Sequence, residues 1–222
     1  MTDETIYASY PVFRAVPELL DRLDREVAAK ELEALLDEWN PKVQTRGIYS
    51  TTGFTPSSDL MLWWVARSVD DVQDLLVAFR RTQLGRALEQ RESFLGITQP
   101  AEFTKDHQPA FVKGEEPKRF ICVYPFVRTP EWYLLAPEER GALLREHGEA
   151  GREFPDVLAN TTSAFGLGDY EWILCFEADE PPRIVQLIRR LRATGARRFT
   201  KLEVPFVSGL RKDPIAAVRD LP

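Results

Sequence analysis

The sequence has little of the two residue types that most metal and redox sites depend on. Cysteine and histidine occur twice each among 222 residues, as Cys122, Cys175, His107 and His147. Each cysteine lies in a short apolar run without a partner at zinc-site or CxxC spacing, so buried reduced thiols are expected. Two histidines exclude a multi-histidine zinc site, although ligation mixed with carboxylates stays open. Each histidine therefore needs an explanation of its own.

Long apolar runs and an excess of positive charge are also missing. No stretch approaches the roughly 20 apolar residues of a membrane span, and acids and bases alternate from the N-terminus onward. Membrane insertion and export are therefore not expected, and the reduced cysteines favour the cytoplasm. The net charge is −6 at pH 7, with basic residues interspersed among acids. A nucleic acid is thus not an expected partner.

The chain is long enough for two packed units, and its periodicity repeats once. Alternating apolar residues predict strands and helical spacing predicts helices. In the first half the strands are 6–15, 43–54, 60–66 and 93–98, with helices at 17–39 and 69–88. After the polar stretch 113–118 the order returns, with strands 119–127, 157–165, 170–177 and 200–207 and helices 137–154 and 181–192. The segment 213–222 predicts a short helical turn and a tail.

The halves also share local sequence, since each places a turn aspartate, Asp59 or Asp169, before an apolar strand and an amphipathic helix. A strand-helix-strand-strand-helix-strand unit is the ferredoxin-like (βαββαβ) motif, whose helices cover one face of an antiparallel sheet. The open faces of two such sheets can bury each other. We therefore predict an α+β fold with an N-terminal half 1–112 and a C-terminal half 113–222, whose sheets pack into a barrel-like core.

The first helix of the second half carries a histidine on its apolar face. Pro137 suits a first helical position, which predicts where the helix begins. Leu143, His147, Ala150 and Phe154 follow at helical spacing, so the imidazole is expected to point inward. The position alone does not say whether this histidine is a ligand or a core residue.

Two glycines on the same helix bear on that question. Gly148 and Gly151 each cost roughly 1 kcal/mol of helix stability relative to alanine, which indicates that room is needed beside His147. A flat macrocycle would use such room. The alternative is a core histidine satisfied by hydrogen bonds, with glycines that permit close packing of the helix on the sheet. From the residues alone both interpretations stay open.

Three further residues have a structural and a functional interpretation. His107 lies in the loop that joins the halves, where histidines are commonly idle. Tyr124 precedes Pro125 on a strand, where it could be a core aromatic. Trp132 could equally be a packing aromatic.

Together these segments resemble the coproheme decarboxylases of the chlorite-dismutase-like superfamily, in particular their actinobacterial branch. The resemblance covers nearly the whole chain and rests on the order and spacing of five short motifs. They are CVYPFVR at 122–128, EWYLL at 131–135, EHG at 146–148, FGLGDYEW at 165–172 and VPF at 204–206.

The resemblance implies peroxide-dependent oxidative decarboxylation of coproheme, an iron porphyrin that is both substrate and redox cofactor, to haem b. It implies that His147 is the axial ligand of the iron and that Tyr124 forms the radical that takes a hydrogen from a propionate. His107 is implied as a distal base that deprotonates hydrogen peroxide. Arg128 is the first candidate to bind a propionate, and Trp132 matches a tryptophan near the reacting propionate.

The resemblance further implies a homo-oligomer, commonly a pentamer, and a transient contact with ferrochelatase is a further expected interaction. Three alternatives remain at this point. One is a haem-binding or haem-delivery protein that leaves the porphyrin unchanged, and another is a cofactor-free protein whose sheets form an interaction surface. The third is a chlorite dismutase, which is disfavoured because the segment 157–162 has no arginine to hold the oxyanion.

Overall fold

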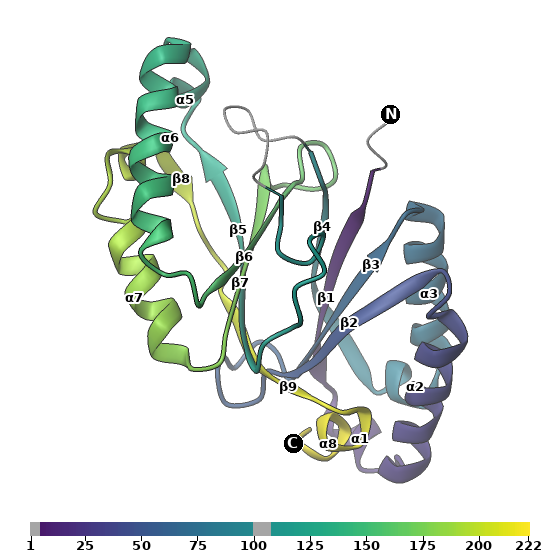
Figure 1. The fold of residues 1–222 in the computed structure, drawn as a ribbon. Helices are drawn as coiled ribbons and strands as arrows, with labels where there is room; N and C mark the ends of the chain where they lie inside the picture. The colour runs from purple at the N-terminus through teal and green to yellow at the C-terminus, as the bar shows by residue number, and fades with distance from the viewer. Residues whose placement is uncertain (1–4, 100–107) are drawn as a thin grey trace. The chain divides into compact units, whose positions relative to one another are not determined.

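The computed structural model describes residues 5–99 and 108–222 and groups the chain into two compact units (Figure 1). The first unit comprises Met1–Ile97 and Val207–Pro222, and the second comprises Thr98–Phe206. This grouping differs from the predicted halves, 1–112 and 113–222, because the C-terminal segment belongs with the first unit. Both units combine an antiparallel sheet with helices, so the mixed α+β class is confirmed.

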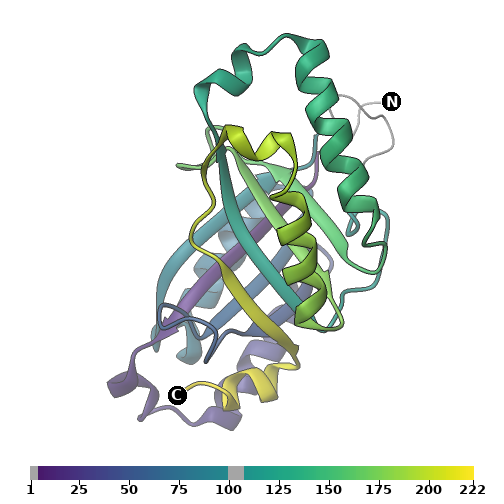
Figure 2. The same cartoon turned by 90° about the vertical axis from the view of Figure 1, so that its left-hand side faces the viewer.

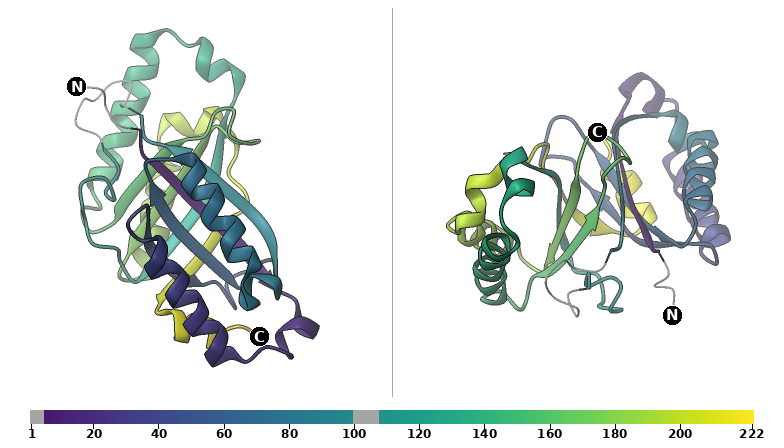
Figure 3. Two further views of the ribbon diagram at one scale, coloured as in Figure 1. Left: turned by 90° about the vertical axis from the view of Figure 1, so that its right-hand side faces the viewer. Right: turned by 90° about the horizontal axis from the view of Figure 1, so that it is seen from above.

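The first unit contains the predicted strand-helix-strand-strand-helix-strand order, with the short helices α1 and α4 inserted and with β9 and α8 added. Its elements are β1 (Tyr7–Ala15), α1 (Pro17–Leu20), α2 (Arg25–Trp39), β2 (Val43–Ser50), β3 (Leu60–Ala66), α3 (Val69–Arg81), α4 (Gln83–Arg86), β4 (Leu88–Ile97), β9 (Val207–Lys212) and α8 (Pro214–Arg219). The strands pair antiparallel in the order β4-β1-β3-β2-β9. Helices α2 and α3 lie along one face of this sheet (Figure 3).

The alternation of side chains along β3 explains why the helices cover that face. Leu60, Leu62 and Trp64 belong to the core shared with the helices, since side chains two apart on a strand share a face. The ring of Phe79 from α3 lies 6.3 Å from that of Trp64 and 5.1 Å from that of Phe13 in β1, measured between centroids. The inward-facing side chains of the strands and of α3 therefore pack against each other.

Two predicted helices of the first unit are each divided by a capping side chain. The predicted helix 17–39 is interrupted at Asp24, whose Oδ1 accepts from the N–H groups of Glu26 and Val27 at 3.0 and 3.1 Å. The predicted helix 69–88 ends before Thr82, whose hydroxyl accepts from the N–H of Gly85 at 2.9 Å. An N-cap begins a new helix because its side chain satisfies the unpaired first N–H groups.

The second unit repeats the order, and its elements hold the candidate site. They are β5 (Phe120–Arg128), α5 (Pro130–Leu134), α6 (Pro137–Arg152), β6 (Leu158–Ser163), β7 (Trp172–Ala178), α7 (Pro181–Leu191), the 3₁₀ turn η1 (Gly195–Phe199) and β8 (Thr200–Leu202). The strand order is β6-β7-β5-β8, again antiparallel. Figure 2 shows α6 and α7 on one face of this sheet.

The predicted strand 200–207 is wrong as a single element. The structure has β8 at Thr200–Leu202, paired with β5, and β9 from Val207 onward, paired with β2 of the first unit. Pro205 lies between them, and its missing N–H removes a donor that a continuous ladder would need. The predicted turn at 213–222 is α8, which Asp213 caps through a 2.7 Å bond from the N–H of Ala216.

The two cysteines are buried in the core. Cys122 in β5 and Cys175 in β7 are buried thiols, as expected. Within residues 5–99 and 108–222, no group of three or more His, Cys, Asp or Glu side chains could hold a metal ion. Across the same residues, no helix is both long enough and apolar enough to traverse a bilayer.

Candidate functional site

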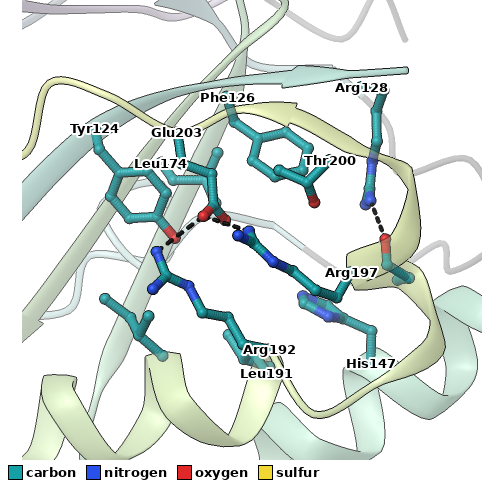
Figure 4. Close-up of a pocket in the computed structure, with 12 residues that line it drawn as sticks. Tyr124, Phe126, Arg128, His147, Leu174, Leu191, Arg192, Arg197, Thr200 and Glu203 are labelled. Atoms are coloured by element: carbon teal, nitrogen blue, oxygen red, sulfur yellow. Dashed lines mark hydrogen bonds and ion pairs between the residues drawn. The ribbon is translucent and has the colours of Figure 1, made fainter. Parts of the chain in front are cut away.

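A pocket in the second unit brings together three of the predicted site residues (Figure 4). It is partly open to solvent, and about 50 Å³ of it is wide enough to admit the centre of a water molecule. Tyr124 and Arg128 reach it from β5 and His147 reaches it from α6, so residues from separate motifs share one cavity. The lining is completed by Phe126, Leu174, Ile188, Leu191, Arg192, Ala196, Arg197, Thr200 and Glu203.

Tyr124 is held by strand pairing and by aromatic contacts. It lies opposite Leu174 of β7 and is only 4% exposed. Its ring is stacked on that of Phe206, with centroids 4.3 Å apart and an angle of 24° between the planes. Burial raises the pKa of the phenol well above its usual value, and the electrostatic effect of nearby Cys122 and Glu203 adds to the rise. The phenol therefore keeps its proton at any physiological pH.

His147 is placed as the helical spacing predicted. Helix α6 begins at Pro137, carries Glu138 and Glu139 in its first turn and presents a half-buried His147 to the pocket. The imidazole Nδ1 lies 3.3 Å from the hydroxyl of Thr194. Burial and then the positive charge of Arg128 lower the pKa of His147 to about 4. At neutral pH the ring is uncharged and has a lone pair available for a metal.

Close packing of the helix on the sheet, one of the two explanations for the glycines beside His147, is not supported by the structure. A Cβ at Gly148 would come no closer than 3.8 Å to Arg152 Nη1, and one at Gly151 would lie 3.9 Å from Leu191 Cδ2. Both are ordinary van der Waals distances. The close approach occurs instead at Gly195, where a Cβ would lie 2.8 Å from Leu143 Cδ2.

Arg128 is held at the pocket by a carbonyl and by two rings. Its Nη1 donates to the carbonyl of Ala196 at 2.9 Å. Its Cζ lies 4.0 Å from the ring centroid of Trp132 and 4.6 Å from that of Phe126. Burial lowers the pKa of Arg128 to about 10, so it stays positively charged at neutral pH. Trp132 is not among the lining residues, and it meets the pocket through Arg128.

Two arginines and a glutamate in the pocket were missed by sequence reasoning. Glu203 Oε2 accepts from Arg192 Nη2 at 2.8 Å and also forms an ion pair with Arg197. The prediction that basic residues are evenly interspersed fails locally, since 189–198 has five arginines and no acid. That local cluster was the available signal, and it would have indicated a site for an anionic ligand.

The remaining predicted catalytic residue, His107, lies outside the residues that the structure describes. The segment that follows it is fixed by β6, where Asn160 is fully buried. Its Oδ1 accepts from the N–H of Phe111 at 2.9 Å, and its Nδ2 donates to Glu177 at 3.0 Å. Glu177 in turn accepts from the N–H of Lys118 at 3.0 Å. Asn160 therefore anchors the chain that enters β5.

The chemistry of the pocket fits an iron porphyrin. A neutral imidazole is a common axial ligand of haem iron. Phe126, Leu174 and Leu191 supply apolar surface for a macrocycle, and three arginines supply positive charge for its carboxylates. Haem ligation needs one imidazole, so the lack of a cluster of metal ligands among the described residues does not conflict with this fit.

Comparisons with known proteins agree with the fold and with the resemblance drawn from the sequence. The family model described as chlorite dismutase matches residues 25–212. A protein of Mycolicibacterium smegmatis named coproheme decarboxylase is 49% identical over 207 residues, which are 92% of this chain and 89% of that protein. A protein of the same name from Thermus thermophilus is 26% identical over 184 residues, 76% of this chain and 73% of that one.

Solved structures extend the likeness of fold. A mutant chlorite dismutase from Candidatus Nitrospira defluvii superposes with a TM-score of 0.87 at 24% identity, over 98% of this chain and 96% of that chain. The same enzyme in complex with imidazole gives a TM-score of 0.87, over 97% of this chain and 94% of that chain. At this level of identity the likeness supports the fold alone.

Proposed function

The chain belongs to the chlorite dismutase family, and within that family we propose that it is a coproheme decarboxylase. It converts two propionates of iron coproporphyrin III to vinyl groups and so forms haem b, with hydrogen peroxide as the oxidant. The observation that carries the proposal is that His147 and Tyr124, taken from separate motifs, line the same pocket. The 49% identical relative of the same name supports it independently of the geometry.

His147 holds the substrate by its iron. When bound, coproheme supplies the iron centre at which peroxide is reduced. The low pKa of His147, about 4, keeps its ring nitrogen unprotonated across the physiological range. Neutral imidazole is the form that binds a metal, because a protonated ring has no lone pair.

Tyr124 carries hydrogen from the substrate. Its phenol is buried and neutral, so it gives up an electron and a proton together and then recovers both from the propionate side chain. The propionate next loses a second electron and its carbon–carbon bond to the carboxylate, which leaves carbon dioxide and a vinyl group. One propionic acid group and one hydrogen peroxide give one vinyl group, one carbon dioxide and two waters.

The arginines orient the substrate through its carboxylates. Arg128, Arg192 and Arg197 all line the pocket, and a guanidinium binds a carboxylate with two parallel hydrogen bonds. Trp132 keeps Arg128 in place from 4.0 Å. His107 removes a proton from hydrogen peroxide as a general base.

The proposal also covers the fold, the cellular compartment, the oligomeric state and a protein partner. We further propose that each unit is a ferredoxin-like half, with helices on one face of its antiparallel sheet. The enzyme acts in the cytoplasm as a homo-oligomer, a pentamer by family resemblance, and contacts ferrochelatase transiently to receive its substrate.

Tyr124→Phe tests the function most directly, because it removes the reactive O–H and keeps the ring. Coproheme is added to the purified variant, then peroxide, and carbon dioxide and porphyrin mass are followed. We expect normal coproheme binding and almost no release of carbon dioxide. Tyr7→Phe, on β1 of the first unit, removes a phenol hydroxyl away from the pocket and is the matched control. Wild-type decarboxylation by Tyr124→Phe would overturn the role of Tyr124.

The same experiment separates the enzyme from a haem carrier. The wild-type protein must lose two carboxyl groups from bound coproheme at modest peroxide excess. A complex that binds coproheme through His147 and keeps the mass of the porphyrin unchanged would identify a carrier instead.

A further inference from the structure

We infer that Thr194 is a positioning residue that fixes the tautomer of His147, with the proton on Nδ1 and the lone pair on Nε2. The inference deepens the proposed function and rests on it, since it assigns the nitrogen that meets the iron. Thr194 joins α7 to η1 and is 4% exposed. Nothing in the motifs of the sequence marks this residue.

The hydroxyl of Thr194 has one proton, and its geometry shows where that proton goes. Its Oγ1 lies 2.7 Å from the carbonyl oxygen of Leu191, a normal distance for an O–H donor. The imidazole Nδ1 lies farther away, at 3.3 Å. A carbonyl can only accept, so the hydroxyl donates to Leu191 and offers a lone pair to His147. Nδ1 must then be the donor, which leaves Nε2 unprotonated.

The carboxylate of Glu146, the residue before His147, has a hydrogen-bond partner of its own. Glu146 Oε2 accepts from the N–H of Gly195 at 2.9 Å. Two consecutive residues of α6 therefore bind two consecutive residues of the loop, Glu146 with Gly195 and His147 with Thr194. The absence of a side chain at Gly195 permits this approach, because its Cβ would lie 2.8 Å from Leu143 Cδ2. These two hydrogen bonds hold residues 194–195 against α6 beside the imidazole.

A ligand histidine needs its second nitrogen satisfied, because that bond sets the tautomer and the direction of the ring. A carboxylate in this role would pull the proton away from Nδ1 and make the imidazole a stronger ligand. The Thr194 hydroxyl is neutral, and because its proton goes to Leu191 it only accepts from His147. The hydrogen bond to Thr194 therefore fixes the orientation of the His147 ring without giving the imidazole strong anionic character.

The tautomer can be measured without any porphyrin. The ¹⁵N spectrum of histidine-labelled protein at pH 7 contains two imidazoles, because the chain has only two histidines. We expect wild-type His147 to show a protonated Nδ1 and an unprotonated Nε2. In Thr194→Val, which lacks the hydroxyl at nearly the same volume, both nitrogens should move toward the mixed values of free imidazole. Thr194→Ser keeps the hydroxyl and should restore the wild-type pattern.

Coproheme-loaded protein gives the second measurement. In Thr194→Val the iron–imidazole stretching band in the resonance Raman spectrum of the ferrous complex should broaden and shift, and coproheme should bind about tenfold more weakly. Thr194→Ser should match the wild type. A purely structural role would lower stability and leave the band unchanged.

The outcomes separate this inference from the proposed function. A wild-type imidazole protonated on Nε2, or a Thr194→Val spectrum identical to the wild type, would overturn the inference. If Thr194→Val does not fold, the wild-type tautomer alone decides. Correct tautomers with no coproheme binding would instead contradict the proposed function.

Discussion

The ring of Phe206 lies against the ring of Tyr124, with centroids 4.3 Å apart and planes inclined by 24°. Tyr124 belongs to β5 and Phe206 follows β8 along the chain, so the stack joins a central strand of the second unit to the end of that unit. Another ring neighbour of Tyr124, Phe176, is farther away at 6.2 Å between centroids. Phe206 is therefore the residue that fixes the plane of the phenol.

Phe206→Leu should remove the stacking partner of the Tyr124 ring. Stacked pairs contribute about 1 kcal/mol beyond the area they bury, so we expect the free energy of unfolding to fall by about 1–2 kcal/mol. Carbon dioxide release in a single turnover should slow severalfold, while coproheme affinity stays unchanged. Urea unfolding and stopped-flow measurements check both. Phe206→Tyr keeps the stack and serves as control, and a leucine variant with the wild-type rate would contradict the prediction.

Glu203→Gln should strengthen substrate binding. Glu203 is the shared partner of Arg192 and Arg197, and the substrate carries four propionates that compete for those arginines. Loss of the Glu203 charge should make the free energy of coproheme binding more favourable by about 1 kcal/mol. This corresponds to a roughly fivefold lower Kd. The affinity should also depend more steeply on salt. Titration of the Soret band at two salt concentrations measures both effects.

The control for this change is Glu153→Gln, which also removes one negative charge but leaves the pocket intact. Glu153 pairs with Arg190 on the surface, at 2.8 Å. Equal affinity gains in both variants would show that net charge, rather than release of the two pocket arginines, is responsible.

Helical and strand periodicity predicted most of the fold because burial acts on local sequence. The inward position of His147 followed from its spacing to Leu143 and Ala150, and the pocket contains it. The resemblance to coproheme decarboxylases, drawn from five short motifs, is confirmed by the relative from Mycolicibacterium smegmatis. These features are encoded within a few turns or strands of the chain.

The errors came from features that depend on distant parts of the chain or on single polar atoms. The strand 200–207 divides because β8 pairs with β5 whereas β9 pairs with β2, which no local pattern reveals. The helix 17–39 divides because Asp24 caps its second part. The shared contact of Arg192 and Arg197 with Glu203 depends on the turn at η1 and on β8. Thr194 was not predicted because no sequence pattern marks a single threonine in a loop.

Asn160→Leu should destabilise the second unit. The change leaves the buried N–H of Phe111 without its 2.9 Å acceptor and takes a 3.0 Å donor from the fully buried Glu177. Leaving such groups unsatisfied costs about 3 kcal/mol in the free energy of unfolding. Thermal and urea unfolding measure the loss. Thr161→Leu on the exposed face of the same strand is the control, with an expected change of about 0.5 kcal/mol or less.

The pH dependence of coproheme binding should follow His147. In the folded protein its pKa is lowered to about 4 by burial and by the charge of Arg128, whereas an unfolded histidine titrates at about 6.5. Between these values the unfolded chain binds more protons than the folded one. The stability due to the neutral ring is therefore complete above about pH 6.5 and is lost as the pH falls toward 4.

Binding should follow the folded pKa rather than the unfolded one, because the substrate meets the folded pocket. We expect coproheme affinity to stay level from pH 7 to about 5 and to fall as the pH drops through about 4. A histidine ¹⁵N titration of the apo protein locates the pKa, and Soret titrations locate the loss of binding. Arg128→Gln removes the nearby charge and should raise both midpoints together. A binding midpoint near 6.5 would mean that the imidazole is solvated, and the pocket would then lack the dry environment assigned to it.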